Sequence, residues 1–375
     1  MKSNEIARSE VICPGIVEAS KEGTLDNGHD HQNQNGTEGE LGRLDHQSEQ
    51  VRHPLSPSRH SPLLTIVGPT ASGKTATAIA LARELGGEVI SADSRYLYRG
   101  MDVGTAKPTL EEMAGIPHHL IDIADPTDDY SLALYQRDAY AAIGDVLGRD
   151  KLPILAGGTP LYLNAVLEGW RIPEAAPDPT FRAEMDAIAN ESGNDALHAR
   201  LATIDPAAAG RIPATNRRRV IRALEIHHLT GRPMSELEGK SPPPYRVLKL
   251  GLMPSRDRLV ARIERRVDAQ IEQGFVEEVQ RLLDAAVPLN APAMSAIGYR
   301  ELADYLGGRS TLAEAIERIR FHTHRYVRHQ LGWLRKMPDV VWFDPEADGW
   351  FERLREEVIR FLSPDETASR TRGVD

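Results

Sequence analysis

The sequence predicts an α/β fold in which helices wrap a parallel sheet and a helical insertion interrupts the core. From residue 61 onward, short apolar runs alternate with amphipathic helical patterns, and this alternation is typical of parallel sheets. The stretch GPTASGKT at 68–75 has the spacing of a loop that binds phosphate between a strand and a helix. Residues 176–213 carry prolines and helical patterns without a strand-like run, which indicates the insertion.

Each core element follows from its local pattern. The run 61–67 is apolar and β-branched, and the helix after Thr75 meets Gly86, a residue suited to a C-cap. Further strands are expected at 88–94, 118–123, 151–159 and 246–254, a helix at 131–148, and helices from 256 to about 337. Ligands of parallel sheets bind at the carboxyl ends of the strands, so the loops after these strands should surround one site.

Five regions are expected. They are a tail at 1–60, a first core part at 61–175, the insertion at 176–213, a second core part at 214–340, and a C-terminal helix and tail at 341–375. Residues 1–60 contain no Phe, Trp or Tyr, so they cannot bury enough apolar surface to offset the entropy of ordering, and we expect disorder there.

The composition excludes several classes of protein. With 375 residues and 41% apolar content, the chain can bury a sizeable core. It lacks an apolar run of about eighteen residues, so we expect no membrane span. The single cysteine, Cys13, indicates no disulfide framework and a reducing cytoplasm. A net charge of −10 argues against nucleic-acid binding over the whole surface but allows local basic patches.

The glycine-rich loop predicts a phosphate cradle. Its residues are Gly68, Pro69, Thr70, Ala71, Ser72, Gly73, Lys74 and Thr75. Such a loop turns backbone N–H groups toward phosphate oxygens, and the following helix points its positive end at the same anion. Lys74 can reach the terminal phosphates and Thr75 can ligate Mg²⁺. A glycine-rich turn with an incidental lysine is the alternative, and the flanking strand and helix argue against it.

Polar residues at the predicted strand ends are candidates for chemistry. Asp93 can accept a proton from an attacking group, although Asp93 and Ser94 also suit a helix N-cap. Asp122 follows an apolar run, as does the Mg²⁺-holding Asp of phosphate-loop ATPases, but structural Asp residues are common there. Thr159 can bond a phosphate or leaving-group oxygen, or it can cap the helix that Pro160 begins.

Two basic runs predict a nucleic-acid surface. RIPATNRRRVIR contains five arginines and no acid, and residues 318–336 contain six Arg or Lys residues interleaved with aromatic side chains. Arginines with aromatics can neutralise phosphates and stack on splayed bases, while a solvated helix face is the alternative. Arg258, Arg262 and Arg266 share one helix face and can clamp a pyrophosphate, or they can form surface ion pairs with Glu264 and Asp268.

The chain resembles the bacterial tRNA dimethylallyltransferases, also called tRNA isopentenyltransferases. The matching stretches are GPTASGKT, ADSRYLYRGMDVGTAKP, PHHLIDI, GGT-LY, RRVIRALEI, GFVEEV, IGYRE and HQLGWLR. The resemblance implies a P-loop NTPase-like fold, Mg²⁺ as cofactor, and transfer of a dimethylallyl group from dimethylallyl diphosphate to N6 of adenosine 37. That adenosine lies beside the anticodon in tRNAs that read codons starting with U. It also implies a cytoplasmic enzyme, which we expect to be a monomer.

The resemblance also assigns residues. Asp93 corresponds to the acid at the adenine, Thr159 to the threonine at the leaving group, and Lys74 acts with them. Donor binding falls on 70–75 and Arg262, and metal binding on Thr75. Contacts to tRNA fall on Asp93, Ser94, Arg95, Tyr96, Thr159, Arg182, Arg218, Arg219, Val220, Ile221, Arg222, Tyr299, Arg300, Arg328, Gln330, Trp333 and Arg335.

The sequence departs from the family pattern at two places near the end of the match. His329 and Gly332 stand where the family commonly has a fixed positive charge and a hydroxyl, so those two contacts are in doubt. Two other functions suit the same loop: a small-molecule or nucleoside kinase that uses ATP, and an RNA-binding ATPase that switches affinity on hydrolysis.

Overall fold

The computed structural model describes residues 61–173 and 175–363. The expected disordered tail at 1–60, Cys13 within it, and the polar end after 363 lie outside the described residues. Among the described residues, no helix is long and apolar enough to cross a membrane.

A six-stranded sheet forms the core, and every neighbouring pair of its strands is parallel. Its order is β3 (His118–His119), β2 (Gly87–Ser91), β4 (Leu152–Gly157), β1 (Ser61–Val67), β7 (Tyr245–Leu252) and β8 (Val340–Phe343). In register, Val67 at the end of β1 lies beside Gly157 of β4 and Gly251 of β7. The expected parallel sheet wrapped by helices is confirmed.

Two predicted strands are shorter in the structure. The run 118–123 forms a strand only at its first two residues, because Leu120 and Asp122 adopt positive φ angles of 61° and 56° and end the extended backbone. The run 88–94 forms a strand only to Ser91, and the polar residues after it make a loop.

Helices cover both faces of the sheet. On one face, α1 (Lys74–Leu85) and α13 (Trp350–Leu362) bury Leu81, Leu354 and Val358 against β-strand side chains such as Ile66 and Leu250. The other face packs against α3 (Leu132–Gly148), α4 (Pro160–Leu167), α10 (Phe275–Asp284) and α11 (Tyr299–Leu306). Burial of apolar area on both faces explains the near-continuous apolar runs of these strands.

Two long helices flank the phosphate loop. They are α9 (Arg256–Glu272) and α12 (Leu312–Leu334), which pack together through Leu259, Ile263 and Val327. Ala71 of the loop rests on this same small apolar cluster. Two short elements, α2 (Leu110–Met113) and the 3₁₀ turn η1 (Ala293–Ser295), lie in the connections.

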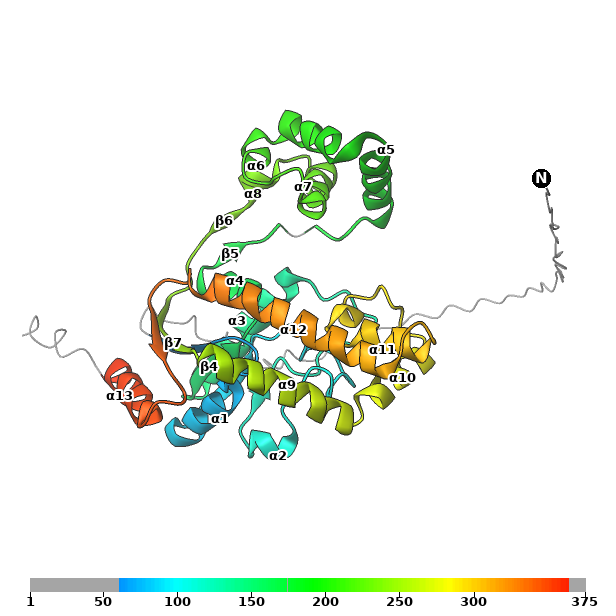
Figure 1. Ribbon diagram of the computed structural model, residues 1–375. Coiled ribbons are helices and arrows are strands. Elements are labelled where there is room, and N and C mark those ends of the chain that lie inside the picture. Colours follow the sequence, from blue (N-terminus) through cyan, green and yellow to red (C-terminus); the bar gives the residue numbers. More distant parts are fainter. Residues whose placement is uncertain (1–60, 174, 364–375) are drawn as a thin grey trace, which may run out of the picture. The chain divides into compact units, whose positions relative to one another are not determined.

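The helical insertion comprises α5 (Pro179–Ile204), α6 (Pro206–Ala209), α7 (Arg217–Thr230) and α8 (Met234–Leu237). A two-stranded antiparallel ribbon of β5 (Trp170–Arg171) and β6 (Gly239–Lys240) forms its two chain connections (Figure 1). The insertion therefore continues beyond the expected end at residue 213. The reason is packing, because Val220 and Leu224 of α7 share an apolar cluster with Leu197 and Leu201 of α5.

A buried carboxylate ties the loop after β2 to α10. Glu278 is fully buried and accepts hydrogen bonds from the backbone N–H groups of Asp102, Val103 and Gly104 at 2.8–3.0 Å. The hydroxyl of Tyr299 on α11 donates to the same carboxylate at 2.7 Å. Four donors thus solvate one charge in the interior, which is how a protein keeps a carboxylate there without a cation.

We expect Glu278→Gln to lower the free energy of unfolding by about 2–4 kcal/mol, because an amide leaves a donor facing the backbone N–H groups. Urea unfolding followed by circular dichroism measures this change. The control is Glu277→Gln, the exposed neighbour on α10, which should shift stability by less than about 0.5 kcal/mol. Equal urea midpoints for Glu278→Gln and Glu277→Gln would contradict the stabilising role of the four hydrogen bonds to Glu278.

Candidate active site

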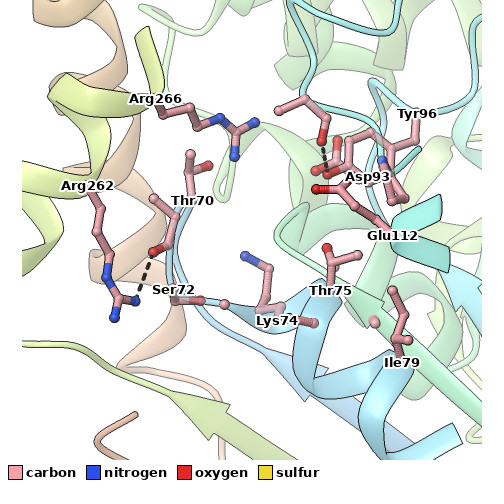
Figure 2. A pocket seen from close by; sticks show the side chains of 17 residues that line it. Thr70, Ser72, Lys74, Thr75, Ile79, Asp93, Tyr96, Glu112, Arg262 and Arg266 are labelled. Atoms are coloured by element: carbon pink, nitrogen blue, oxygen red, sulfur yellow. Dashed lines mark hydrogen bonds between the residues drawn. The ribbon is translucent and has the colours of Figure 1, made fainter. Parts of the chain in front are cut away.

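The phosphate loop opens into a cavity of about 540 Å³ at the carboxyl edge of the sheet. Residues 70–75 line it, while Gly68 and Pro69 lie outside its lining. Gly73 adopts φ 94°, a left-handed conformation that directs the chain from the loop into α1. Figure 2 shows Lys74 and Thr75 projecting into the cavity from the start of α1. The structure therefore brings together the loop residues that the sequence predicts as a phosphate cradle.

Lys74 is held in an environment that disfavours its charge. The pKa of Lys74 is lowered to about 8, mainly by desolvation; the charge of Asp93 opposes this shift and that of Arg266 adds to it. Its ammonium group donates a hydrogen bond of 2.7 Å to the carbonyl of Pro69. A bound anion would stabilise this charge, so the site is poised to gain electrostatic energy on binding phosphate.

Arginines of α9 form the opposite wall. Arg262 and Arg266 line the cavity and face Asp93, Tyr96 and Glu112 across it (Figure 2). Arg262 donates weakly to the carbonyl of Ala71 at 3.4 Å, so it approaches the loop directly. Arg258 does not line the cavity and is exposed beside Glu346. Of the three arginines predicted to clamp a pyrophosphate, only Arg262 and Arg266 therefore line the cavity.

Asp93 lies in a loop and caps no helix, since the next helix begins at Leu110. Its carboxylate accepts a 3.0 Å hydrogen bond from the backbone N–H of Arg95, and one edge remains toward the cavity that it lines. Burial raises the pKa of neighbouring Tyr96 to about 12, with the Asp93 charge adding to the effect. Asp93 is therefore one of two carboxylates, with Glu112, that line the cavity at the cradle.

Thr159 has the backbone position of an N-cap but makes no capping hydrogen bond through its side chain. Its hydroxyl instead accepts a 3.1 Å hydrogen bond from the backbone N–H of Ser94. The glycines before it permit this approach, because a Cβ at Gly157 would lie 2.2 Å from the carbonyl oxygen of Ala92. Asp93 and Thr159 are thus joined through one backbone contact.

A chain of cavities leads from the cradle to the surface. The first shares Thr70, Asp93 and Arg266 with a second cavity of about 190 Å³. The second shares residues 295–297 and Tyr326 with a third cavity of about 420 Å³, which is rimmed by Arg300 and Arg325. Asp93 therefore lines both the cavity at the phosphate loop and the neighbouring cavity on the side of α12.

Asp102 and Asp122 lie outside this chain of cavities. Both accept 2.5 Å hydrogen bonds from Lys107, a buried lysine that the sequence reading missed. Lys107 also donates to the carbonyl of Tyr98 at 2.8 Å. Asp122 therefore anchors the loop after β2, and the structure does not support a role in holding Mg²⁺.

The residues at the cradle are compatible with a Mg²⁺ ion that binds together with a phosphate ligand. Within the described ranges, no cluster of three or more His, Cys, Asp or Glu side chains could hold a metal by itself. Thr75 lines the cavity with Asp93 and Glu112, all hard oxygen donors. Mg²⁺ at phosphate sites commonly uses one or two protein oxygens, with phosphate and water completing the shell.

The first basic run divides into paired and unpaired arginines. Arg182 and Arg222 bind the fully buried Glu225 at 2.7 and 2.6 Å, so they hold the insertion together. Arg218 and Arg219 are exposed at the start of α7 and form no ion pair among the described residues. These two side chains remain available for phosphates.

Four residues expected at a tRNA surface are buried. Val220 and Ile221 belong to the apolar cluster of the insertion, and Tyr299 is fully buried against Glu278. Gln330 is 3% exposed and bonds to the phosphate loop. The expectation of direct side-chain contacts to RNA is therefore wrong for these four, because their tertiary partners hold them inside.

The second basic run has the same division. Arg318 and Arg320 pair with acids of neighbouring helices, Arg320 with Glu264 and Asp268. Arg328 and Arg335 are exposed and, in the part of the chain that the structure describes, unpaired. Trp333 lies between these two arginines in the sequence, and 37% of its surface is exposed. Unpaired arginines beside an exposed aromatic ring suit single-stranded nucleic acid.

Family models and relatives match most of the chain. The IPP transferase model matches residues 96–337 and the Isopentenyl transferase model matches 62–124. The chain is 61% identical over 305 residues to a tRNA dimethylallyltransferase of Thermomicrobium roseum, covering 81% of this chain and 93% of that protein. It is 50% identical over 299 residues to the tRNA dimethylallyltransferase of Roseiflexus castenholzii, covering 80% and 97%.

Solved structures of two transferases are similar to this chain over most of its length. A full-length tRNA isopentenylpyrophosphate transferase from Bacillus halodurans is similar with a TM-score of 0.62 and 43% identity, over 84% of this chain and 100% of that one. A eukaryotic dimethylallyltransferase, captured acting on tRNA, is similar with a TM-score of 0.68 and 28% identity, over 80% and 78%. Because the family model and these relatives match most of its length, the chain belongs to the IPP transferase family.

Proposed function

We propose that this protein transfers a dimethylallyl group from dimethylallyl diphosphate to N6 of an adenosine in tRNA and releases diphosphate. Membership of the IPP transferase family supports the reaction class. Asp93 carries the assignment of the two substrates, because it lines both the cavity of the phosphate cradle and the neighbouring cavity, which shares residues with a third cavity lined by Arg300 and Arg325. We place the acceptor at adenosine 37, beside the anticodon in tRNAs that read codons starting with U.

The donor diphosphate occupies the phosphate loop in this proposal. Backbone N–H groups, Lys74 and Arg262 surround the position where negative charge grows as the allylic C–O bond breaks. Thr75 would hold Mg²⁺ together with the diphosphate, and the ion would supply further charge neutralisation. Thr159 follows Gly158, which approaches Lys74 of the cradle, and we assign its hydroxyl, which donates only a long 3.4 Å hydrogen bond to Ser94, to a leaving-group oxygen.

The acceptor adenine enters from the α12 side and reaches Asp93. A bond forms between N6 and the allylic carbon, the bond from that carbon to the diphosphate oxygen breaks, and the N6 proton passes to the Asp93 carboxylate. Extrusion of the base from its stack costs a few kcal/mol, which stacking and phosphate contacts offset. One chain contains all these groups, and the lone cysteine suits a cytoplasmic setting.

A labelled-donor assay tests the function against its alternatives. Incubation with Mg²⁺, an anticodon stem-loop RNA and labelled dimethylallyl diphosphate should place label on the RNA. A parallel arm replaces the donor with labelled ATP. Phosphoryl transfer only from ATP would identify a kinase, and RNA-stimulated ATP hydrolysis without a modified base would identify an ATPase switch.

We expect Asp93→Asn to lower kcat by about 10²–10⁴-fold, because the amide cannot accept the N6 proton. Its affinity for stem-loop RNA should stay within about threefold of wild type, since the cationic contacts are unchanged. Asp129→Asn, an exposed neighbour outside the cavities, is the control. Near-normal single-turnover rates for Asp93→Asn would refute the role of this carboxylate.

Donor binding should weaken as pH rises above about 8. The pKa of Lys74 is lowered to about 8 without ligand, and a bound diphosphate raises it, so binding takes up a proton above that pH. Below pH 8 the ammonium is already charged and affinity should be flat. Isothermal titration from pH 6.5 to 9.5 measures this dependence.

Lys74→Arg is the matched variant, because its cation does not titrate in this range. Ionisation of the donor itself affects both proteins equally, so the difference between their profiles reports Lys74. Identical pH dependence in the two proteins would assign the effect to another group.

A further inference from the structure

Gln330 belongs to α12 but bonds to the active-site loops. Its carboxamide oxygen accepts a 2.9 Å hydrogen bond from the backbone N–H of Thr70 in the phosphate loop. Its carboxamide nitrogen donates to the carbonyl of Gly158 at 2.7 Å, immediately before Thr159. The side chain is only 3% exposed, so one buried amide joins both loops to the helix.

Tyr326 lies one turn earlier on the same face of α12. Its side chain lies near Gln330 and Thr159 with 38% of its surface exposed, and desolvation of the hydroxyl raises its pKa to about 12, so it stays protonated at neutral pH. Tyr326 also lines the second cavity together with Asp93. The inner face of α12 therefore contacts the phosphate loop, the leaving-group threonine and the acceptor chamber.

The outer faces of the same helix carry two arginines and a histidine. Arg325, Arg328 and His329 are exposed, and none of them forms an ion pair within the described ranges. Residues 325 to 330 therefore alternate between outward cations and inward contacts over less than two helical turns. A polyanion bound outside and a diphosphate bound inside would touch the same short segment.

The inner contact is tight. A Cβ at Gly158 would lie 2.8 Å from the carboxamide nitrogen of Gln330, and Ala71 packs on the cluster that contains Val327 of α12. Packed interiors do not deform smoothly, so a shift of α12 must either carry the loops with it or break the Gln330 hydrogen bonds.

We propose that Gln330 and Tyr326 are positioning residues that couple RNA binding on the outer face of α12 to diphosphate binding in the cradle. The proposal rests on the proposed function, because it takes RNA and a diphosphate as the two ligands. RNA that fixes α12 also fixes the Thr70 amide and the Thr159 hydroxyl, so the diphosphate binds a better-organised loop. Linkage requires that diphosphate strengthen RNA binding by the same factor.

The experiment measures the Kd of inorganic diphosphate with Mg²⁺, in the absence and presence of saturating stem-loop RNA. The wild-type ratio should be at least about fivefold, the lower end of typical coupling. Gln330→Met keeps the size of the side chain and removes both hydrogen bonds, and its ratio should fall to within about twofold of unity. The Kd of this variant for RNA alone should remain that of wild type. A variant that is only destabilised would instead bind RNA more weakly.

Glu317→Gln is the control on the same helix, since Glu317 is exposed outside the three connected cavities, and it should keep the wild-type ratio. Tyr326→Phe, which removes a single hydroxyl, should lower the ratio partly and serves where Gln330→Met does not fold. A ratio near unity in wild type, or an unchanged ratio in both variants, overturns the coupling. Label transfer in the donor assay is scored separately, so coupling without prenylated RNA would refute only the proposed function.

Discussion

The active site depends on how closely the backbone loops approach at the carboxyl edge of the sheet. Parallel pairing of β1 with β4 and of β4 with β2 places the ends of three strands side by side, and the backbone N–H of Thr159 donates to the carbonyl of Ala92 at 3.2 Å. Only glycine fits at 157, because any Cβ would overlap Ala92. The phosphate loop, Asp93 and Thr159 come from separate strands, and this approach makes them one site.

Cationic side chains repel one another at the cavity of the phosphate loop, and a bound anion would relieve this repulsion. Lys74, Arg262 and Arg266 converge on one cavity, and both desolvation and the charge of Arg266 depress the pKa of Lys74. Asp93 compensates only in part. A bound diphosphate would supply the missing negative charge, so binding energy would come from cancelling repulsion already present as well as from new hydrogen bonds. The same charges then stabilise the leaving group without reorganisation.

Sequence patterns predicted the sheet and the phosphate loop because both depend on local spacing. They predicted less well where tertiary contacts decide. Leu120 and Asp122 look like strand residues, but a left-handed backbone ends β3 before them. Val220, Tyr299 and Gln330 stand in motifs that suggested RNA contact, yet partners distant in sequence bury them. Lys107 and Glu278 stand in stretches that match the family, GTAKP and GFVEEV, but only the fold shows which loops they hold.

Whether an arginine of a basic run can bind a polyanion depends on whether an acidic side chain lies close enough to pair with it. The protein is acidic overall, yet its basic runs supply unpaired arginines only at selected places, such as Arg218 on α7 and Arg328 on α12. Neighbouring arginines are neutralised by Glu225 and Glu264 and act as structural cations. A polyanion therefore meets a few free cations on an otherwise repulsive surface. This pattern favours one docking orientation over general attraction, because misplaced phosphates face uncompensated carboxylates.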